Sequence, residues 1–147
     1  VSFRSNSSTG NTTAVDTLVE EVGVCRDFAH LMIALCRAVN IPARFAATID
    51  YGADPALGPT DFHACVEVYL GDRWYLFDPS GVAIPMVFVR LGTGRDAADT
   101  AFSTIFGGVR GAAPVIQIEA IPNAAGQLLV PQHVAQALST DGQALPA

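Results

Sequence analysis

The sequence contains little charge, few cysteines and no long apolar run. Only 15% of its 147 residues are charged, and its 8 basic residues are outnumbered by 14 acidic ones. The net charge of −6 argues against nucleic acid or an anionic membrane surface as a partner, because both repel an acidic protein. No stretch approaches the about 20 apolar residues of a membrane-spanning helix, so we predict no membrane span. The 3 cysteines lie far apart and do not form a disulfide framework, so we expect reduced thiols and a cytoplasmic location.

Half of the residues are hydrophobic, and a chain of this length can bury the core of one domain. Residues 1–13 are rich in Ser, Thr, Asn and Gly, which predicts a flexible N-terminal segment. We expect one domain over residues 14–122 and an extension or tail over residues 123–147. Because the chain begins at Val1 rather than Met, we interpret it as a fragment of a longer protein.

A nearly all-apolar stretch over residues 25–39 predicts the central helix. A helix that is apolar on nearly every side must be buried between other elements. Gly23 lets the backbone turn into this helix, and Pro42 stops it. Cys25 therefore lies in the first turn, where unpaired N–H groups and the helix dipole favour a negatively charged sulfur.

The remaining pattern predicts a short helix followed mainly by antiparallel strands, which is an α+β fold. Thr12 or Thr13 can cap the short helix, and Asp50 to Asp61 carries the Pro, Gly and Asp residues of a loop. The helix is expected over residues 14–20, and the strands over 43–49, 62–70, 73–78, 84–91 and 115–121.

The turn at Gly71-Asp72 fixes the register of the predicted hairpin, with Leu70 opposite Arg73. That register places Cys65 opposite Asp78. His63 lies two residues from Cys65, on the same face and diagonal to Asp78, at about 7–8 Å between Cα atoms. An imidazole and a carboxylate can meet over that distance, and such a pair activates a nucleophile.

Three motifs in this order resemble the transglutaminase-like superfamily of thiol enzymes. They read Gly-Val-Cys-Arg-Asp-Phe-Ala-His-Leu at residues 23–31, Asp-Phe-His-Ala-Cys-Val-Glu-Val-Tyr at 61–69, and Trp-Tyr-Leu-Phe-Asp-Pro-Ser at 74–80. Together with Ile-Pro-Ala-Arg at 41–44 and Gly-Arg-Asp at 94–96, they are similar to the bacterial branch. The resemblance implies a papain-like core, in which the cysteine's helix packs on an antiparallel sheet, and acyl transfer through a thioester.

The resemblance also implies a catalytic triad. Cys25 would be the nucleophile, His63 the general acid and base, and Asp78 the residue that orients His63. The sequence departs from the family pattern at Cys65, where tryptophan is usual, and residues 1–24 contain no side chain that we identify as a second oxyanion donor. The Cys25 backbone N–H remains as one donor. We interpret Cys65 and Trp74 as candidate residues of the cleft lining.

The predicted function is that of a cysteine protease or amidohydrolase acting on a peptide or protein substrate, without a cofactor. We favour hydrolysis because water is the default acceptor of a thioester unless the site excludes it. Alternatives are a protein-glutamine transglutaminase, a catalytically silent binding module, and a zinc site. The zinc site would use Cys25, His63, Cys65 and Asp78, which lack the usual ligand spacing. Arg95, Asp96 and Asp99 are expected to form a salt-bridged turn.

Overall fold

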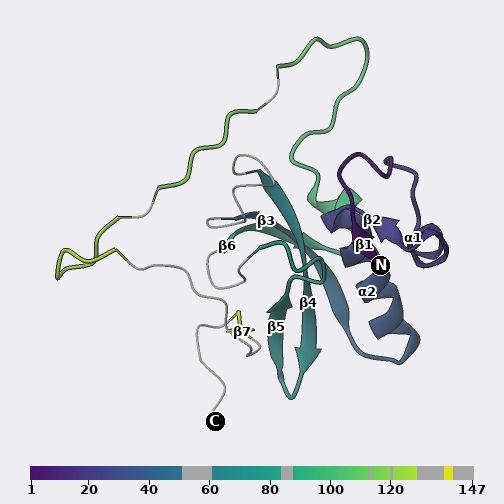
Figure 1. Ribbon diagram of the computed structural model, residues 1–147, viewed down its shortest axis with the longest axis horizontal. Coiled ribbons are helices and arrows are strands. Elements are labelled where there is room, and N and C mark those ends of the chain that lie inside the picture. Colours follow the sequence, from purple (N-terminus) through teal and green to yellow (C-terminus); the bar gives the residue numbers. More distant parts are fainter. Residues whose placement is uncertain (51–60, 84–87, 113, 120, 129–137, 141–147) are drawn as a thin grey trace.

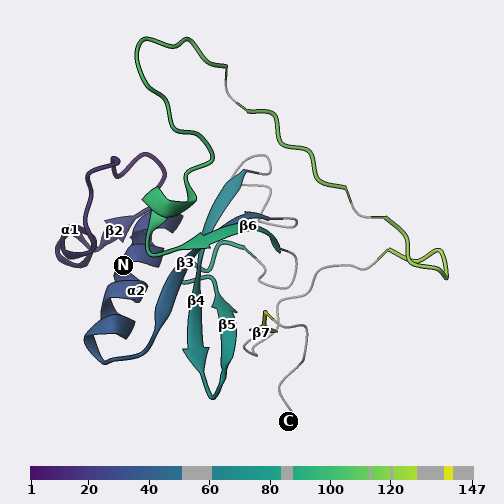
Figure 2. The ribbon, with the colours of Figure 1, turned by 180° about the vertical axis from the view of Figure 1, so that it is seen from behind.

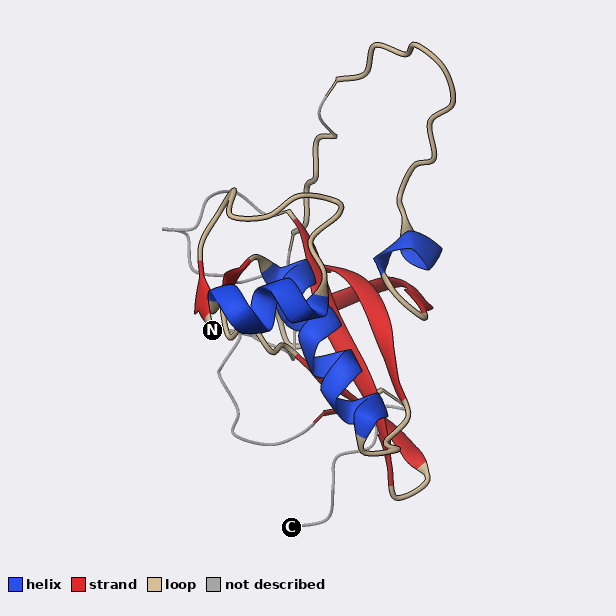
Figure 3. Cartoon of the chain, turned by 90° about the vertical axis from the view of Figure 1, so that its right-hand side faces the viewer, coloured by secondary structure: helices blue, strands red, loops and turns tan. Residues whose placement is uncertain are grey.

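A computed structural model describes residues 1–50, 61–83, 88–112, 114–119, 121–128 and 138–140 of the chain. These residues form the expected α+β fold, in which an antiparallel sheet has the strand order β6-β3-β4-β5-β7 (Figure 1). Helix α2 packs on β3 and β4, and α1 packs on α2 (Figure 3). The strands of the sheet are β3 (Ala43–Asp50), β4 (Phe62–Leu70), β5 (Arg73–Phe77), β6 (Phe88–Gly94) and β7 (Leu138–Ser139).

The remaining described elements are α2 and four shorter ones. They are α1 (Ala14–Glu20), β2 (Val22–Gly23), α2 itself (Cys25–Ala38), the 3₁₀ helix η3 (Ala97–Thr100) and β1 (Ser2–Phe3). Thr13 caps α1, as one of the two predicted candidates. Residues 1–13, which we expected to form a loop, include β1, and β1 pairs in parallel with β2.

The start of α2 is fixed by a local contact between Asp27 and the residues before the helix. Asp27 Oδ2 accepts a hydrogen bond from the Val24 N–H at 2.8 Å, which satisfies a donor ahead of the first turn. A Cβ atom on Gly23 would lie 2.8 Å from Asp27 Cβ. Gly23 is therefore needed for this close approach.

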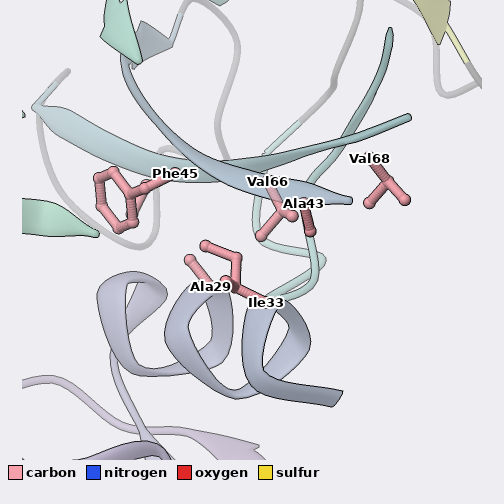
Figure 4. Close-up of a cluster of buried hydrophobic side chains, with 7 residues drawn as sticks. Ala29, Ile33, Ala43, Phe45, Val66 and Val68 are labelled. Atoms are coloured by element: carbon pink, nitrogen blue, oxygen red, sulfur yellow. The ribbon is translucent and has the colours of Figure 1, made fainter. Parts of the chain in front are cut away.

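The prediction that α2 is buried on nearly every side is wrong. Ala29 and Ile33 face the sheet beside Phe45 and are buried (Figure 4), whereas Leu35 and Val39 are more than half exposed. The sheet covers one side of α2, and α1 is half its length, with 7 residues against 14. The outer side of α2 is therefore covered only in part.

The β4–β5 hairpin has the predicted register. Gly71 and Asp72 both have positive φ angles, of 52° and 68°, which is the backbone of a type I′ turn. Leu70 pairs with Arg73, and Tyr69 pairs with Trp74. The turn chemistry that the sequence encodes therefore sets the alignment of the whole hairpin.

The predicted strand over residues 115–121 is wrong, since residues 114–119 and 121 form no regular structure. This part of the chain runs away from the sheet (Figure 2), and Val115 and Ile121 are more than four-fifths exposed. Alternating apolar residues favour a strand only where a neighbouring edge accepts its hydrogen bonds. Strand β7, further along the chain, pairs with β5. The predicted strand at 84–91 is found as β6, and residues 84–87 lie outside the described part.

One buried charge cluster supports the central strands. Glu67 on β4 is fully buried, and Arg44 and Arg90 each donate to its carboxylate at 2.6 Å. The Arg44 guanidinium also lies 4.0 Å from the centre of the Trp74 ring. These contacts join β3, β4, β5 and β6. Within the described residues, no helix is long and apolar enough to cross a membrane.

We expect Gly23→Ala to lower the free energy of unfolding by about 1–3 kcal/mol, because the new methyl group must displace Asp27. Urea denaturation followed by circular dichroism measures the change. Gly10→Ala is the matched control, since a Cβ there meets no atom within 4 Å, and it should stay within about 0.5 kcal/mol of the parent. Equal stability of both variants would show that the fit around Gly23 is not tight.

We expect Glu67→Ala to lower the free energy of unfolding by about 3 kcal/mol, the low end for breaking a buried ion pair, because the two partly exposed arginines can regain water. The same urea titration measures it. Glu119→Ala removes an exposed carboxylate and should change stability little. A loss below about 1 kcal/mol for Glu67→Ala would contradict a structural role for the cluster.

Candidate active site

Cys25 is the first residue of α2, and its side chain is half-buried. As the first helical residue, it has no intrahelical carbonyl partner for its N–H group. Neighbouring charges are directed elsewhere. Asp27 binds Val24, and Arg26 donates to Asp27, Ser8 and the Thr9 carbonyl. Asp27 therefore serves the start of the helix.

His63 and Asp78 meet at the end of the hairpin, as the register predicted. His63 Nε2 lies 3.1 Å from Asp78 Oδ1, and both side chains are almost completely buried. The Nε2–H direction departs from a straight hydrogen bond, so the contact is chiefly electrostatic. The His63 ring also stacks on Phe88, at 5.4 Å between ring centres. The imidazole is thus held between a carboxylate and an aromatic face.

Asp78 is held in place by the residues that follow it. Its Oδ1 accepts from the Ser80 hydroxyl at 2.6 Å and from the Ser80 N–H at 3.0 Å, and its Oδ2 accepts from the Ala83 N–H at 3.0 Å. Sequence reasoning missed this support. The available signal was the Asp-Pro-Ser triplet, because Asp and Ser two residues apart commonly close a turn of this kind.

The charges of this group shift the pKa values of His63 and Asp78 in opposite directions. Burial by itself lowers the pKa of His63, but polar contacts and charge interactions with Asp78 and Cys25 outweigh it and raise that pKa from 6.5 to about 10. Burial also opposes ionisation of Asp78, yet His63, Ser80 and Ala83 together lower its pKa. The structure therefore favours an imidazolium beside a carboxylate, with the Cys25 side chain in contact with the same ring.

A cavity of about 680 Å³ lies beside Cys25 and His63. Its walls come from the start of α2, from β3, β4 and β6, and from η3 and the two residues after it. The lining residues are Val24, Cys25, Arg26, Phe45, Ala47, Phe62, His63, Ala64, Leu91, Gly92, Thr93, Ala97, Asp99, Thr100, Ala101 and Phe102. The sequence motifs predict that Cys25 and His63 lie together. The other walls of the cavity depend on where the fold places β6 and η3 relative to these two residues.

The two residues predicted to line the cleft do not line this cavity. Cys65 is completely buried in the sheet, where its Sγ lies 3.6 Å from Thr48 Oγ1. Burial raises the pKa of the Cys65 thiol, the hydrogen bond with Thr48 lowers it, and the charges of Asp78, Cys25 and Asp50 raise it further. Trp74 lies under Arg44, further along the hairpin. Cys65 shares a face of β4 with His63, but it is covered by Thr48 of the neighbouring strand. Trp74 pairs with Tyr69 beside the hairpin turn, far from the end of the hairpin where His63 lies.

Asp50, at the end of β3, is a second buried carboxyl near the pair. Its Oδ1 has no hydrogen-bond partner in the described part of the chain. Burial raises the pKa of Asp50, the charge of His63 lowers it, and Asp78 and Asp61 raise it further. Sequence reasoning placed Asp50 in a loop. Its spacing of two from Thr48, which pairs with His63, was the signal that it shares their face.

The predicted salt-bridged turn at residues 95–99 is confirmed, and it positions η3. Arg95 Nε lies 2.9 Å from Asp99 Oδ2, and Asp96 caps η3 through the Ala98 N–H. His30 Nε2 accepts from the Ala97 N–H at 3.1 Å. Burial and the charge of Arg26 lower the pKa of His30, which suits an acceptor nitrogen without a proton.

The residues of the alternative zinc site do not form a metal-binding group. Among the described residues, no three His, Cys, Asp or Glu side chains are arranged to hold a metal ion. Cys65 faces Thr48, and Asp78 is occupied by Ser80, Ala83 and His63.

Comparisons with known proteins found relatives that are similar in sequence and in fold. A crystal structure from Cytophaga hutchinsonii, described as a "putative cysteine protease", has a TM-score of 0.68 and 47% sequence identity, and covers 74% of this chain and 36% of that one. An uncharacterized protein of Mycobacterium leprae is 32% identical over 96 residues, which are 62% of this chain and 34% of that protein. An uncharacterized protein of Mycobacterium tuberculosis is 32% identical over 108 residues, which are 66% of this chain and 34% of that protein.

The chain thus spans about a third of the length of these relatives. The model of the transglutaminase-like superfamily matches residues 1–79, more than half of the chain. The matched range includes Cys25, His63 and Asp78. The fold is that of a transglutaminase-like cysteine protease, and the chain belongs to the transglutaminase-like superfamily.

Proposed function

We propose that this domain is a cysteine hydrolase that cleaves amide bonds of peptide or protein substrates, with Cys25, His63 and Asp78 as its triad. One observation carries the proposal. Cys25 and His63 line the same cavity and lie close enough for Cys25 to raise the pKa of His63, while Nε2 of the same imidazole lies 3.1 Å from Asp78 Oδ1. A nucleophile, a base and a residue that orients the base are the parts of nucleophilic acyl transfer.

In this mechanism, the Cys25 sulfur attacks the carbonyl carbon of the substrate amide and forms a carbon–sulfur bond. The imidazolium of His63 then donates its proton to the departing nitrogen, and the carbon–nitrogen bond breaks. A thioester remains on Cys25. His63 next takes a proton from water, the hydroxyl oxygen attacks the thioester carbon, and the carbon–sulfur bond breaks to release the acid.

The N-terminus of α2 supplies the first stabilisation of the oxyanion. The Cys25 N–H has no partner within the helix, and it lies at the positive end of the helix dipole. A preorganised N–H group of this kind is worth much more to a developing negative charge than a flexible donor in water.

Asp78 acts on the reaction through His63. Its two oxygens are fixed by Ser80 and Ala83, so the carboxylate can balance an imidazolium without moving. The acceptor decides between hydrolysis and transfer to an amine. Water is the default because Cys25 is only half-buried, so solvent can reach it. A transglutaminase reaction would use the same thioester, and an added primary amine distinguishes the two by the product formed.

The first test is selective alkylation of the thiols at about pH 6, where an ordinary thiol with a pKa of about 8.5 reacts slowly. We expect a limiting amount of iodoacetamide to label Cys25 at least tenfold faster than Cys36 or Cys65, measured by peptide mass spectrometry. Cys36 and Cys65 are internal controls, because both lie in the same molecule and burial raises the pKa of each.

His63→Ala should remove the preference for Cys25, and circular dichroism checks that the variant folds. Asp78→Asn keeps the shape of the side chain and should weaken the preference, because the imidazolium loses its balancing charge. Uniform labelling of all three thiols in the parent protein would sink the proposed triad.

The second test follows the protonation of His63. Because its pKa is raised to about 10 in the folded protein, we expect its ring resonances in NMR spectra to stay those of an imidazolium between pH 7 and 9. The stabilisation from this charge is complete below about pH 6.5 and is lost as the pH rises through about 10. Asp78→Asn should lower the midpoint.

His30 provides the contrast within the same spectra. Its lowered pKa predicts a neutral ring at pH 7, and Asp78→Asn should leave its midpoint unchanged. A midpoint for His63 at or below 6.5 would contradict the charged pair.

A further inference from the structure

We infer that the cavity beside Cys25 binds a large apolar side chain of the substrate, next to the amide that is cleaved. This inference rests on the proposed function and adds the substrate class to it. The same cavity that contains Cys25 and His63 is otherwise walled mainly by aliphatic, alanine and aromatic side chains, among them Phe45, Ala47 and Leu91. Transfer of an apolar side chain from water into such a cavity is favourable.

The His63 imidazolium in the lining is balanced by Asp78, and the other two charged residues of the lining also have partners. Arg26 Nη2 lies 3.2 Å from Asp27, and Asp99 binds Arg95 through both of its carboxylate oxygens. A charged substrate side chain would enter the cavity without an unpaired opposite charge to meet it. It would lose hydration without compensation, which disfavours acidic and basic side chains.

The cavity is large enough to hold a side chain bigger than a methyl group or a short aliphatic chain. Its volume of about 680 Å³ lies within the usual range of about 300–1,000 Å³ for ligand pockets. A phenylalanine or leucine side chain, together with the adjoining backbone, therefore has enough space beside the reactive sulfur.

Phe62 and Phe102 form an aromatic wall of this cavity. Their rings stack with centres 4.6 Å apart and an interplanar angle of 7°. Phe62 directly precedes His63 on β4, so the wall adjoins the proposed base. Phe102 is 70% exposed, although a large apolar side chain is normally covered, and a bound apolar group would cover part of it.

The segment at residues 94–100, which includes the salt-bridged turn, holds the Phe102 side of the wall in place. A Cβ atom on Gly94 would clash with Asp99 Cβ, so β6 and η3 approach each other as closely as the backbone allows. The Arg95–Asp99 pair and the hydrogen bond from the Ala97 N–H to His30 fix the same segment. The wall is therefore set by the fold before a substrate arrives, which reduces the entropy lost on binding.

The experiment uses acetyl amino-acid aldehydes as probes, because an aldehyde adds reversibly to a reactive thiol, forming a carbon–sulfur bond while its oxygen takes the thiol proton. Protection of Cys25 from iodoacetamide reports binding. We expect the phenylalanine and leucine aldehydes to protect at concentrations at least tenfold lower than the aspartate and lysine aldehydes.

Phe102→Ala should weaken binding of the phenylalanine aldehyde about tenfold, and the alkylation rate of free Cys25 is measured for each variant so that the protection is compared on the same scale. Phe102→Asp should reduce binding of the phenylalanine aldehyde further and strengthen binding of the lysine aldehyde. Both changes are on an exposed side chain, so the fold should persist. Phe106→Ala and Phe106→Asp are matched controls, because Phe106 is 87% exposed and does not line the cavity.

The possible outcomes distinguish a failure of the apolar pocket from a failure of the proposed function. Equal protection by apolar and charged aldehydes, with normal labelling of Cys25, would overturn the apolar pocket and leave the proposed function standing. An equal effect of the Phe102 and Phe106 variants would also overturn it. Failure of Cys25 to react selectively with iodoacetamide alone would overturn the proposed function, and the pocket with it.

Discussion

The fit between Gly23 and Asp27 determines where α2 begins, and the rest of the site depends on that position. Asp27 reaches back to the Val24 N–H and packs directly over Gly23, where a side chain would not fit. The first residue of the helix is consequently Cys25, whose N–H has no carbonyl partner within the helix. A shift of the helix start by one residue would turn the sulfur by about 100° away from the sheet.

The sheet contains several buried charges, and most of them are balanced. Glu67 is held by two arginines, and Asp78 is held by His63, Ser80 and Ala83. A buried ion pair contributes little net stability, but loss of one partner is costly, so these pairs fix geometry more than they strengthen the fold. Asp50 differs, because one of its oxygens is unpaired within the described residues, and its carboxyl lies near the His63–Asp78 pair.

The family relationship and the site geometry answer different questions. Membership of the superfamily covers residues 1–79 and the fold, whereas the matches cover only about a third of the length of each relative. The cavity, in contrast, is built partly from β6, η3 and Phe102, which lie beyond the matched range. Part of the proposed substrate pocket therefore lies outside the range that the family model matches, whereas Cys25, His63 and Asp78 lie inside it.

The sequence by itself determined the α+β class, the helix at Cys25 and the hairpin register. Each of these follows from local rules, namely helical periodicity, helix start signals and the Gly71-Asp72 turn. Only the tertiary structure decided which residues line the cavity, which side of α2 is exposed, and that residues 115–121 do not form a strand. Those outcomes depend on which distant segments supply a neighbouring surface or sheet edge, and local sequence patterns contain no information about such partners.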